Sequence, residues 1–133
     1  MDDKSLIERV QRLAETSQEE VKCACIIVKD GEVVSEAVNS QHIDNIAVNH
    51  AEIKALVAAN YDRKSRILPG AIVYCSCEPC AMCLTALSYA KVARIVYVRS
   101  MKDLAPDDPQ GNFDSQAFVR TLNFTPQLEQ YKI

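Results

Sequence analysis

The sequence predicts a single α/β domain with helices on both faces of a central sheet. A strand, a helix and a second strand follow one another between Ala71 and Val98, and this order requires a crossover between parallel strands. An amphipathic segment and a hairpin pattern precede them, within residues 3–38. The length of 133 residues suits one ordinary domain.

The composition is that of an ordinary globular chain, with 48% hydrophobic and 25% charged residues. No segment approaches the ~20 unbroken apolar residues of a membrane helix. The 15 Lys+Arg and 18 Asp+Glu residues give a net charge of −3, which provides no overall field to attract nucleic acid or anionic lipid. These values argue against a disordered or membrane-spanning protein and leave a local basic patch open.

The six cysteines raise the question of metal binding or redox chemistry. Residues 1–6 lack the basic start and apolar run of a secretory signal, so we expect a cytoplasmic protein with reduced cysteines. A chain of this apolar content buries a core without needing disulfides.

The first half of the chain predicts a helix, a hairpin and a second helix. Residues 3–17 place apolar side chains at helical spacing. Residues 21–28 are apolar and β-branched, and a hairpin turn at Asp30-Gly31 separates them from an extended segment over 32–38. A polar loop over 39–49 ends in Asn49, a suitable cap for a helix over about residues 50–60.

The crossover unit begins after the turn Leu68-Pro69-Gly70. Residues 71–75 predict a buried strand, and residues 76–79 form a tight connection. A helix over 80–89 then starts just after a proline, and residues 94–98 form the next strand.

The pattern is weaker toward the C-terminus. Residues 100–111 carry two prolines and predict a loop, in which Asp107 and Asp108 are expected to be solvated. We expect a last helix over 113–122, whereas the tail to Ile133 is ambiguous.

Two motifs carry the chemistry, His50-Ala51-Glu52 and Pro79-Cys80-Ala81-Met82-Cys83, each at the start of a predicted helix. Cys80 and Cys83 share a helix face, and a helix N-terminus favours their thiolate forms. His50 supplies a third ligand. One imidazole and two thiolates on Zn²⁺ leave the fourth tetrahedral position for water, which is typical of a catalytic zinc site.

Glu52 is the expected catalytic acid and base. Two residues on a regular helix are turned roughly 200° apart, so His50 must occupy the cap, before the helix begins, if both side chains are to face one cleft. Zinc lowers the pKa of bound water to about 7, and a nearby carboxylate can take its proton and deliver it to a leaving amine. This chemistry suits hydrolytic deamination.

Other interpretations of the cysteines stay open. Cys-x-x-Cys at a helix start also fits a thioredoxin-like dithiol, and Cys75 or Cys77 could complete a closed four-cysteine metal site. Both alternatives leave His50 and Glu52 unused, so the paired motifs favour a catalytic zinc.

We expect the other four cysteines and His42 to have mainly structural roles. Cys23 and Cys25, like Cys75 and Cys77, alternate along strands and are expected to act as small buried hydrophobic residues, although Cys23, Cys25 and Cys77 are also candidates to line the pocket. His42 is expected at the surface of the polar loop rather than as a fourth ligand.

His-x-Glu together with Pro-Cys-x-x-Cys is the signature of zinc deaminases. From about Ile26 to Phe118 the chain resembles the cytidine deaminase-like superfamily, and within it the group of guanine, cytosine and tRNA adenosine deaminases. The anchors of this resemblance are residues 26–31, Asn39, residues 50–52 and residues 77–83. It implies a three-layer α/β/α sandwich with a mixed five-stranded central sheet.

The resemblance also implies site residues and partners. It makes His50, Cys80 and Cys83 the ligands of one Zn²⁺ per subunit, Glu52 the proton shuttle, and Asn39, Ala51 and Asp114 the substrate-binding residues. It also suggests a homodimer, because neighbouring subunits often complete the pocket in this superfamily.

The substrate is expected to be a small amino-substituted heterocycle, such as guanine or a nucleoside, in purine metabolism. Two segments that border the pocket, residues 22–25 and 46–49, depart from the family pattern, and the chain ends before the C-terminal helix that closes the site in guanine deaminases. A tRNA adenosine deaminase is the alternative, although a net charge of −3 argues mildly against phosphate binding. A second alternative is a non-catalytic zinc-stabilised or redox domain.

Overall fold

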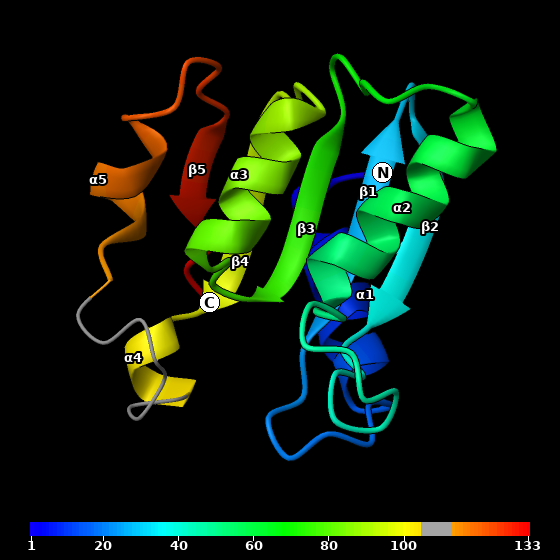
Figure 1. The fold of residues 1–133 in the computed structure, drawn as a ribbon, viewed down its shortest axis with the longest axis vertical. Coiled ribbons are helices and arrows are strands. Elements are labelled where there is room, and N and C mark those ends of the chain that lie inside the picture. The colour runs from blue at the N-terminus through cyan, green and yellow to red at the C-terminus, as the bar shows by residue number, and fades with distance from the viewer. Residues whose placement is uncertain (105–112) are drawn as a thin grey trace.

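The central sheet has five strands in the order β2-β1-β3-β4-β5 (Figure 1). The computed structural model describes residues 1–104 and 113–133. The strands are β1 (Ala24–Lys29), β2 (Glu32–Val38), β3 (Ile72–Cys77), β4 (Arg94–Arg99) and β5 (Gln127–Gln130). β1 pairs antiparallel with β2 and β3, whereas β4 is parallel to β3 and β5 is parallel to β4. The predicted mixed sheet is confirmed.

Helices cover both faces of this sheet and confirm the three-layer prediction (Figure 1). The helices are α1 (Asp3–Ala14), α2 (Ala51–Arg63), α3 (Ala81–Tyr89), α4 (Met101–Leu104) and α5 (Ser115–Val119). One face of the sheet packs against α1, and the other packs against α2 and α3. Among the described helices, none is long and apolar enough to cross a membrane.

The core has two halves, one on each face of the sheet. Leu6, Ile7 and Val10 of α1 are buried against Ile26 and Tyr74 of the sheet. Burying each such aliphatic side chain contributes about 1.5–3 kcal/mol. On the other face, α2 presents its small residues at Ala51, Ala55 and Ala59, which are fully buried. The small side chains let α2 lie close to the sheet.

Chain direction places two helix N-termini at one end of the sheet. α2 precedes β3, α3 follows it, and both helices run opposite to β3 (Figure 1). The starts of α2 and α3 therefore both lie beside the carboxyl end of β3. In the doubly wound style of α/β folds, this end of a sheet is where ligands bind.

The structure differs from the sequence prediction mainly after β4. Met101–Leu104 forms the short helix α4 where a loop was expected, because four residues are too few to show helical periodicity. The ambiguous tail contains the edge strand β5, in which only Leu128 is buried, so it lacks an alternating pattern. The last helix is shorter than the predicted 113–122 segment. Asp107 and Asp108 lie outside the described residues.

An ion pair fastens α1 to the sheet. The Arg94 guanidinium donates to Asp3 Oδ1 and Oδ2 at 2.9 and 2.6 Å, and the Tyr74 hydroxyl donates to Asp3 Oδ1 at 2.6 Å. Arg94 also contacts Glu129 of β5. The hydrogen bond from Arg94, helped by Tyr74, lowers the pKa of Asp3 from its ordinary value of 3.8 although partial burial opposes this.

Asp3→Asn should lower the free energy of unfolding by about 1–2 kcal/mol at neutral pH, because a charged hydrogen-bonded pair is lost. Because folding lowers the pKa of Asp3, its carboxylate stabilises the wild-type protein fully above pH 3.8. This stabilisation is lost as the pH falls through the folded pKa. Urea denaturation at pH 7 and pH 3 measures both effects. Arg9→Ala, which breaks an exposed pair with Glu36, is the control and should cost under about 0.5 kcal/mol. Equal losses in the two variants would contradict the prediction.

Candidate active site

The two sequence motifs meet at the carboxyl end of β3. His50 is the N-cap of α2, with φ −70° and ψ 155°, and Cys80 is the N-cap of α3, with φ −79° and ψ 175°. Both residues therefore have extended backbone, and neither side chain caps its own helix. His50 stands before the first helical turn, as the expected orientation of His50 and Glu52 toward one cleft requires.

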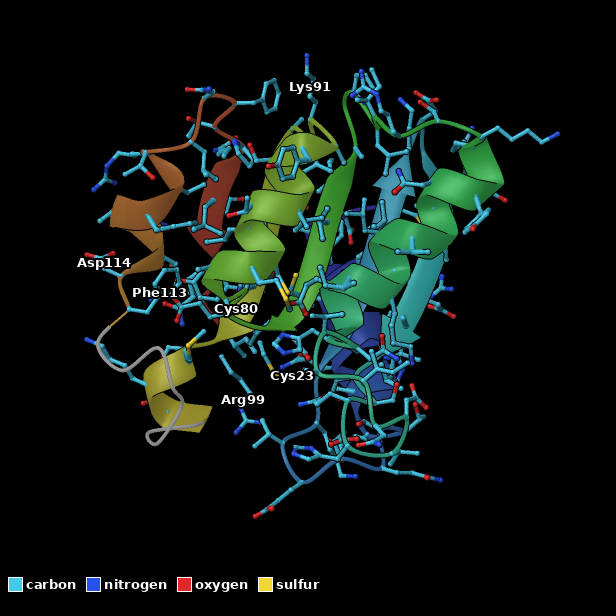
Figure 2. All side chains as sticks on the ribbon, viewed as in Figure 1. Cys23, Cys80, Lys91, Arg99, Phe113 and Asp114 are labelled. Carbon is cyan, nitrogen blue, oxygen red and sulfur yellow. A yellow bond between two sulfur atoms is a disulfide. The ribbon has the colours of Figure 1, made fainter. Side chains whose placement is uncertain are left out.

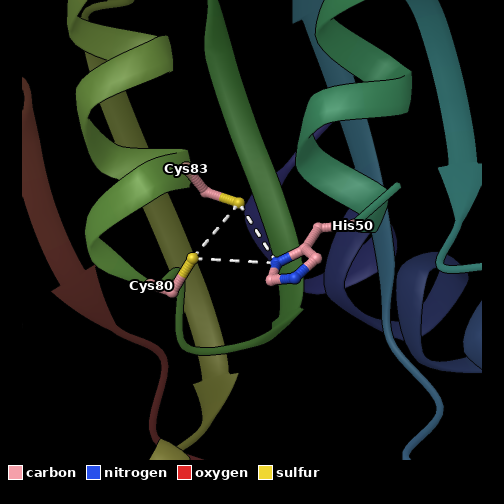
Figure 3. A group of neighbouring side chains, drawn as sticks. All are labelled: His50, Cys80 and Cys83. Atoms are coloured by element: carbon pink, nitrogen blue, oxygen red, sulfur yellow. Dashed lines mark hydrogen bonds between the residues drawn. The ribbon is translucent and has the colours of Figure 1, made fainter. Parts of the chain in front are cut away.

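His50, Cys80 and Cys83 form a triangle of ligand atoms (Figure 3). His50 Nδ1 lies 3.7 Å from the Sγ atom of each cysteine, and the two Sγ atoms lie 3.6 Å apart. In tetrahedral zinc geometry, two thiolates are about 3.8 Å apart and a thiolate and an imidazole nitrogen about 3.6 Å. The three side chains thus fit the family's zinc ion without rearrangement.

The two cysteines of the triangle differ in acidity. A hydrogen bond from Cys83, together with His50, lowers the pKa of Cys80 to about 4, although burial opposes this. The pKa of Cys83 is raised by its hydrogen bond to Cys80 and by burial. Both cysteines bind a metal ion as thiolates, so metal binding would release their protons.

Glu52 is buried beside this triangle, with only 5% of its surface exposed. Burial raises the pKa of Glu52 to about 7, although a hydrogen bond with Cys83 opposes this. The carboxyl group is therefore within hydrogen-bonding reach of Cys83, one corner of the triangle.

A cavity of about 190 Å³ opens onto the triangle. Its lining residues are Val21, Cys23, Asn39, Gln41, His50, Ala51, Glu52, Cys77, Glu78, Cys80 and Met101. Pockets for drug-sized ligands are typically ~300–1,000 Å³, so this smaller cavity suits a ligand of about the size of a heterocyclic base. The sequence prediction placed five of these residues at the site: Asn39, His50, Ala51, Glu52 and Cys80. Cys23 and Cys77, which were candidates to line the pocket, also line the cavity, whereas Cys25 does not.

Asn39 lines the cavity, but most of its amide is used within the chain. Its Oδ1 accepts hydrogen bonds from Ser17 Oγ (2.7 Å) and Cys23 N (3.0 Å), and its Nδ2 donates to Val21 O (2.7 Å). These contacts leave one N–H that no described residue uses. Asn39 thus holds residues 17–23 in place at the cavity wall, and its substrate contact stays a prediction.

Asp114 occupies a different place. Its side chain accepts a hydrogen bond from Ala117 N at 3.1 Å and caps α5. It is exposed and is not among the described residues that line the cavity. Figure 2 shows it beside α5, apart from Cys23 and Cys80. Its expected contact with a substrate also stays a prediction.

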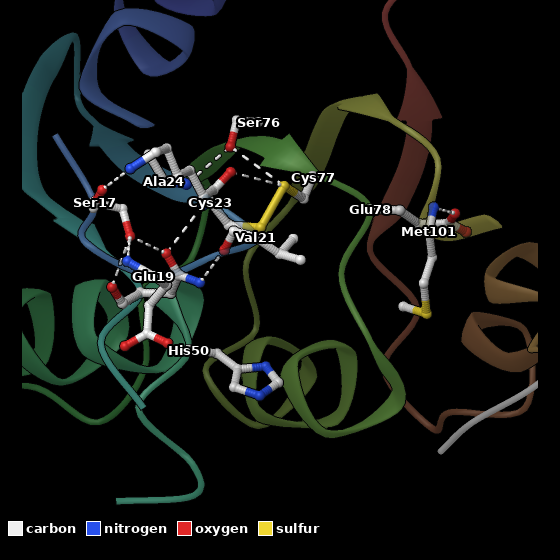
Figure 4. Close-up of a disulfide and its surroundings, with 12 residues drawn as sticks. Ser17, Glu19, Val21, Cys23, Ala24, His50, Ser76, Cys77, Glu78 and Met101 are labelled. Carbon is white, nitrogen blue, oxygen red and sulfur yellow. Dashed lines mark hydrogen bonds between the residues drawn. A yellow bond between two sulfur atoms is a disulfide. The ribbon is translucent and has the colours of Figure 1, made fainter. Parts of the chain in front are cut away.

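A disulfide joins Cys23 to Cys77, so the expectation of reduced cysteines is wrong for this pair (Figure 4). The antiparallel register places Cys25 opposite Cys75, and two residues further along, Cys23 therefore lies opposite Cys77. Cys25 and Cys75 are free buried thiols, as expected for core residues. The sequence shows the alternation of cysteines but not which strands become neighbours.

Two acidic residues that the sequence analysis missed build the edges of the cavity. Glu78 accepts hydrogen bonds from Met101 N at 2.8 Å and Ser115 Oγ at 2.5 Å, which holds the starts of α4 and α5. Glu19 is buried and accepts from the backbone N–H groups of His42 and Ile43, both at 3.1 Å. Glu78 lies within the anchor at residues 77–83, but that motif assigns it no role of its own, and no local motif marks Glu19. The partners of both residues are distant in sequence.

His42 also contacts Glu19, through its Nδ1 atom at 2.6 Å, while 85% of its side chain is exposed. Burial opposes ionisation of Glu19, but the hydrogen bonds outweigh it and lower its pKa. His42 is thus a surface residue of the loop, as expected, and it helps to fix that loop at the cavity.

Comparisons with known proteins agree with this site. A family model described as the cytidine and deoxycytidylate deaminase zinc-binding region matches residues 1–99. A tRNA-specific adenosine deaminase of Streptococcus pyogenes serotype M1 is 33% identical over 114 residues, which are 84% of this chain and 63% of the relative. Guanine deaminase of Bacillus subtilis (strain 168) is 34% identical over 104 residues, 74% of this chain and 67% of the relative.

A solved structure from a study of A-to-I editing by tRNA:A34 deaminases has a TM-score of 0.74 and 27% identity, and the match covers 96% of this chain and 95% of that one. The chain thus spans 63% of the length of the first curated relative and nearly all of this solved structure. The match to residues 1–99 covers both motifs and the sheet through β4. The chain therefore belongs to the cytidine and deoxycytidylate deaminase family of zinc-binding domains.

Proposed function

We propose that this protein is a hydrolytic deaminase that releases ammonia from a small amino-substituted heterocycle, such as guanine or a nucleoside. One observation carries the proposal: a triangle of ligand atoms and a buried carboxyl group share a single small cavity. A closed structural site needs no such cavity, and a dithiol redox site needs no histidine.

His50, Cys80 and Cys83 hold the zinc ion in this proposal. When bound, zinc supplies a Lewis acid that lowers the pKa of a water molecule to about 7. Glu52 accepts the proton of the attacking water on its carboxylate and then delivers it to the departing amino group. The burial of Glu52 keeps bulk water from competing for this proton.

The cavity walls orient the heterocycle. Ala51 is the first residue of α2 and lines the cavity, where its small side chain leaves room for a flat ring. The unused N–H of Asn39 is a donor for a ring carbonyl or ring nitrogen. Asp114 caps α5 and is not among the described residues that line the cavity, so we assign it the weakest role of the predicted set.

A tRNA adenosine deaminase is the second candidate function. It is favoured by the 33% identity with the streptococcal relative and by the TM-score of 0.74 with the solved structure. The net charge of −3 opposes it, because phosphate contacts normally draw on clustered lysine and arginine. The cytoplasmic location and the place in purine metabolism stay predictions.

Zinc binding should depend on the three proposed ligands. We expect about one zinc ion per wild-type chain, and close to none in His50→Ala, Cys80→Ser or Cys83→Ser, because each removes one of three protein ligands. Metal analysis of the purified proteins measures this. His42→Ala, which removes the exposed histidine, should keep its zinc. Full zinc occupancy in His50→Ala would remove His50 from the ligand set.

Replacing Glu52 should separate zinc binding from turnover. Glu52→Gln should retain zinc but release ammonia at least ~100-fold more slowly, because the group that moves protons is lost. Ammonia release is measured across free bases, nucleosides, pterins, triazines and a tRNA anticodon stem-loop. Glu8→Gln, on the exposed side of α1, is the matched carboxylate control.

Each outcome of that panel has a distinct meaning. Turnover of a free base or nucleoside alone supports the main proposal, whereas turnover of the stem-loop alone supports the second candidate. If no compound of the panel releases ammonia while each chain holds one zinc ion, a non-catalytic domain is favoured. Undiminished turnover by Glu52→Gln would exclude Glu52 from the mechanism.

We also propose that two copies of the chain associate through the outer surface of α2 and α3. Large apolar side chains are exposed there: Tyr61 is 80% exposed and Val57 48% on α2, and Tyr89 is 77% exposed on α3. Large apolar side chains exposed on two helices of one face motivate this proposal, because protein interfaces bury such side chains.

Tyr61→Lys should therefore weaken dimerisation at least ~10-fold, because a charge replaces buried aromatic surface. Sedimentation equilibrium measures the association. Ile43→Lys, at an exposed apolar position in the polar loop, is the control and should leave association unchanged. A monomeric wild-type protein at high concentration would contradict the proposal.

A further inference from the structure

The Cys23–Cys77 disulfide forms part of the cavity wall. Both cysteines line the cavity that contains His50 and Glu52, and their Cα atoms lie 5.7 Å apart. Figure 4 shows the disulfide with Val21 and His50 nearby. This covalent bond is therefore next to the space proposed for the substrate.

The disulfide joins two segments of the site that are distant in the sequence. Cys77 is the last residue of β3 and precedes the ligand Cys80 by one short connection. Cys23 precedes β1, and it exchanges hydrogen bonds with Asn39: Cys23 N donates to Asn39 Oδ1 and Asn39 N donates to Cys23 O, both at 3.0 Å. The disulfide thus ties the wall that Asn39 and Cys23 form, here called the Asn39 wall, to the side of the cavity that carries the proposed zinc ligands.

Backbone pairing between β1 and β3 stops short of the disulfide. The last paired residues at this end are Cys25 and Cys75. Beyond them, the strands are held by a hydrogen bond from Ala24 N to Ser76 Oγ at 2.8 Å, by a contact of 3.5 Å between Cys77 Sγ and Lys22 O, and by the disulfide. Without the covalent bond, few direct contacts would keep Cys23 against the end of β3.

The two sides of the bond are not equally fixed. Cys77 is paired with Arg99 of β4, and Glu78 N donates to Arg99 O at 2.8 Å, so the β3 side is anchored in the sheet. Lys22, next to Cys23, is exposed and lies outside any strand. Breaking the disulfide should therefore leave Cys23 bonded to Asn39 but loosen the attachment of both residues to the end of β3.

Accessibility distinguishes this pair from the neighbouring thiols. Cys25 and Cys75 are fully buried, whereas Cys23 is partly exposed and the disulfide borders an open cavity. Thiol–disulfide exchange requires a thiolate to reach one sulfur atom. A small thiol that enters the cavity can reach the Cys23–Cys77 bond but not the inner pair.

We propose that the Cys23–Cys77 disulfide is a redox-sensitive positioning element, which holds the Asn39 wall at the distance from the zinc ligands that the substrate requires. Two molecules of a small thiol such as glutathione reduce it by two electrons, giving two protein thiols and one oxidised glutathione. Oxidised glutathione restores the bond by the reverse exchange. The effect on turnover rests on the proposed deaminase function, whereas the effect on the wall does not.

The test equilibrates the zinc-loaded protein with glutathione at different ratios of the reduced to the oxidised form. Alkylation under denaturing conditions with a chelator, followed by mass spectrometry, should detect four thiols in the oxidised protein and six in the reduced one. Amide hydrogen exchange at Cys23 and Asn39 should accelerate at least ~10-fold on reduction, because local opening becomes easier. Zinc content should not change.

The kinetic readout separates positioning from catalysis. With the best substrate of the panel, reduction should raise KM about tenfold and change kcat less than about threefold, because the wall that orients the substrate is no longer preorganised. Cys23→Ser should reproduce the reduced state at every glutathione ratio. Cys25→Ala, which keeps the disulfide, should keep the redox response.

Two results would overturn the proposal. One is a disulfide that never forms, with six thiols at every glutathione ratio. The other is identical hydrogen exchange at Cys23 and Asn39 in the oxidised and reduced proteins. If no substrate turns over in either state, the proposed deaminase function fails, and the thiol count and hydrogen exchange still decide this inference.

Discussion

The candidate site depends on one constraint of chain direction, namely that α2 and α3 both run opposite to β3 and begin beside its carboxyl end. This arrangement brings two helix N-termini together on one face of the sheet. His50 and Cys80 occupy the cap positions, where extended backbone turns each side chain away from its own helix. A three-cornered ligand group therefore forms from segments that are distant in sequence, and its geometry follows from the sheet.

The same constraint explains the spacing within each motif. Cys83 follows Cys80 by one helical turn, so the two sulfur atoms lie 3.6 Å apart on one side of α3. Glu52 lies two residues after His50, but only Glu52 is inside the helix, so both can face the cavity. The partial positive charge of the α3 N-terminus favours the thiolate form of Cys80, which occupies the N-cap. The two-residue spacing of His50 and Glu52 would point them apart inside a helix, but it lets both face the cavity because His50 precedes the helix.

The sequence was sufficient to predict the parts of the structure that rest on local pattern. Periodicity and turn residues predicted β1 to β4 and the helices before and after β3, and the two motifs predicted the ligand triangle. The missing parts depend on contacts between distant segments. The strand β5 has one buried residue, the Cys23–Cys77 pair depends on strand register, and the buried Glu19 is identified only by its contacts with His42 and Ile43. None of these has a local signature.

The two sides of the cavity are therefore built in different ways. The zinc side stands on regular elements, with β3 paired to β4 and Glu78 bonded to the backbone of Arg99. The opposite side consists of irregular segments, residues 17–23 and 40–49, held by Asn39, Glu19 and the disulfide. Residues 22–25 and 46–49, for which the resemblance implies departures from the family pattern, overlap these irregular segments, whereas the two motifs at residues 50–52 and 79–83 lie outside them. A fold arranged in this way can change the substrate that it accepts by rebuilding one wall, because the chemistry is fixed on the other.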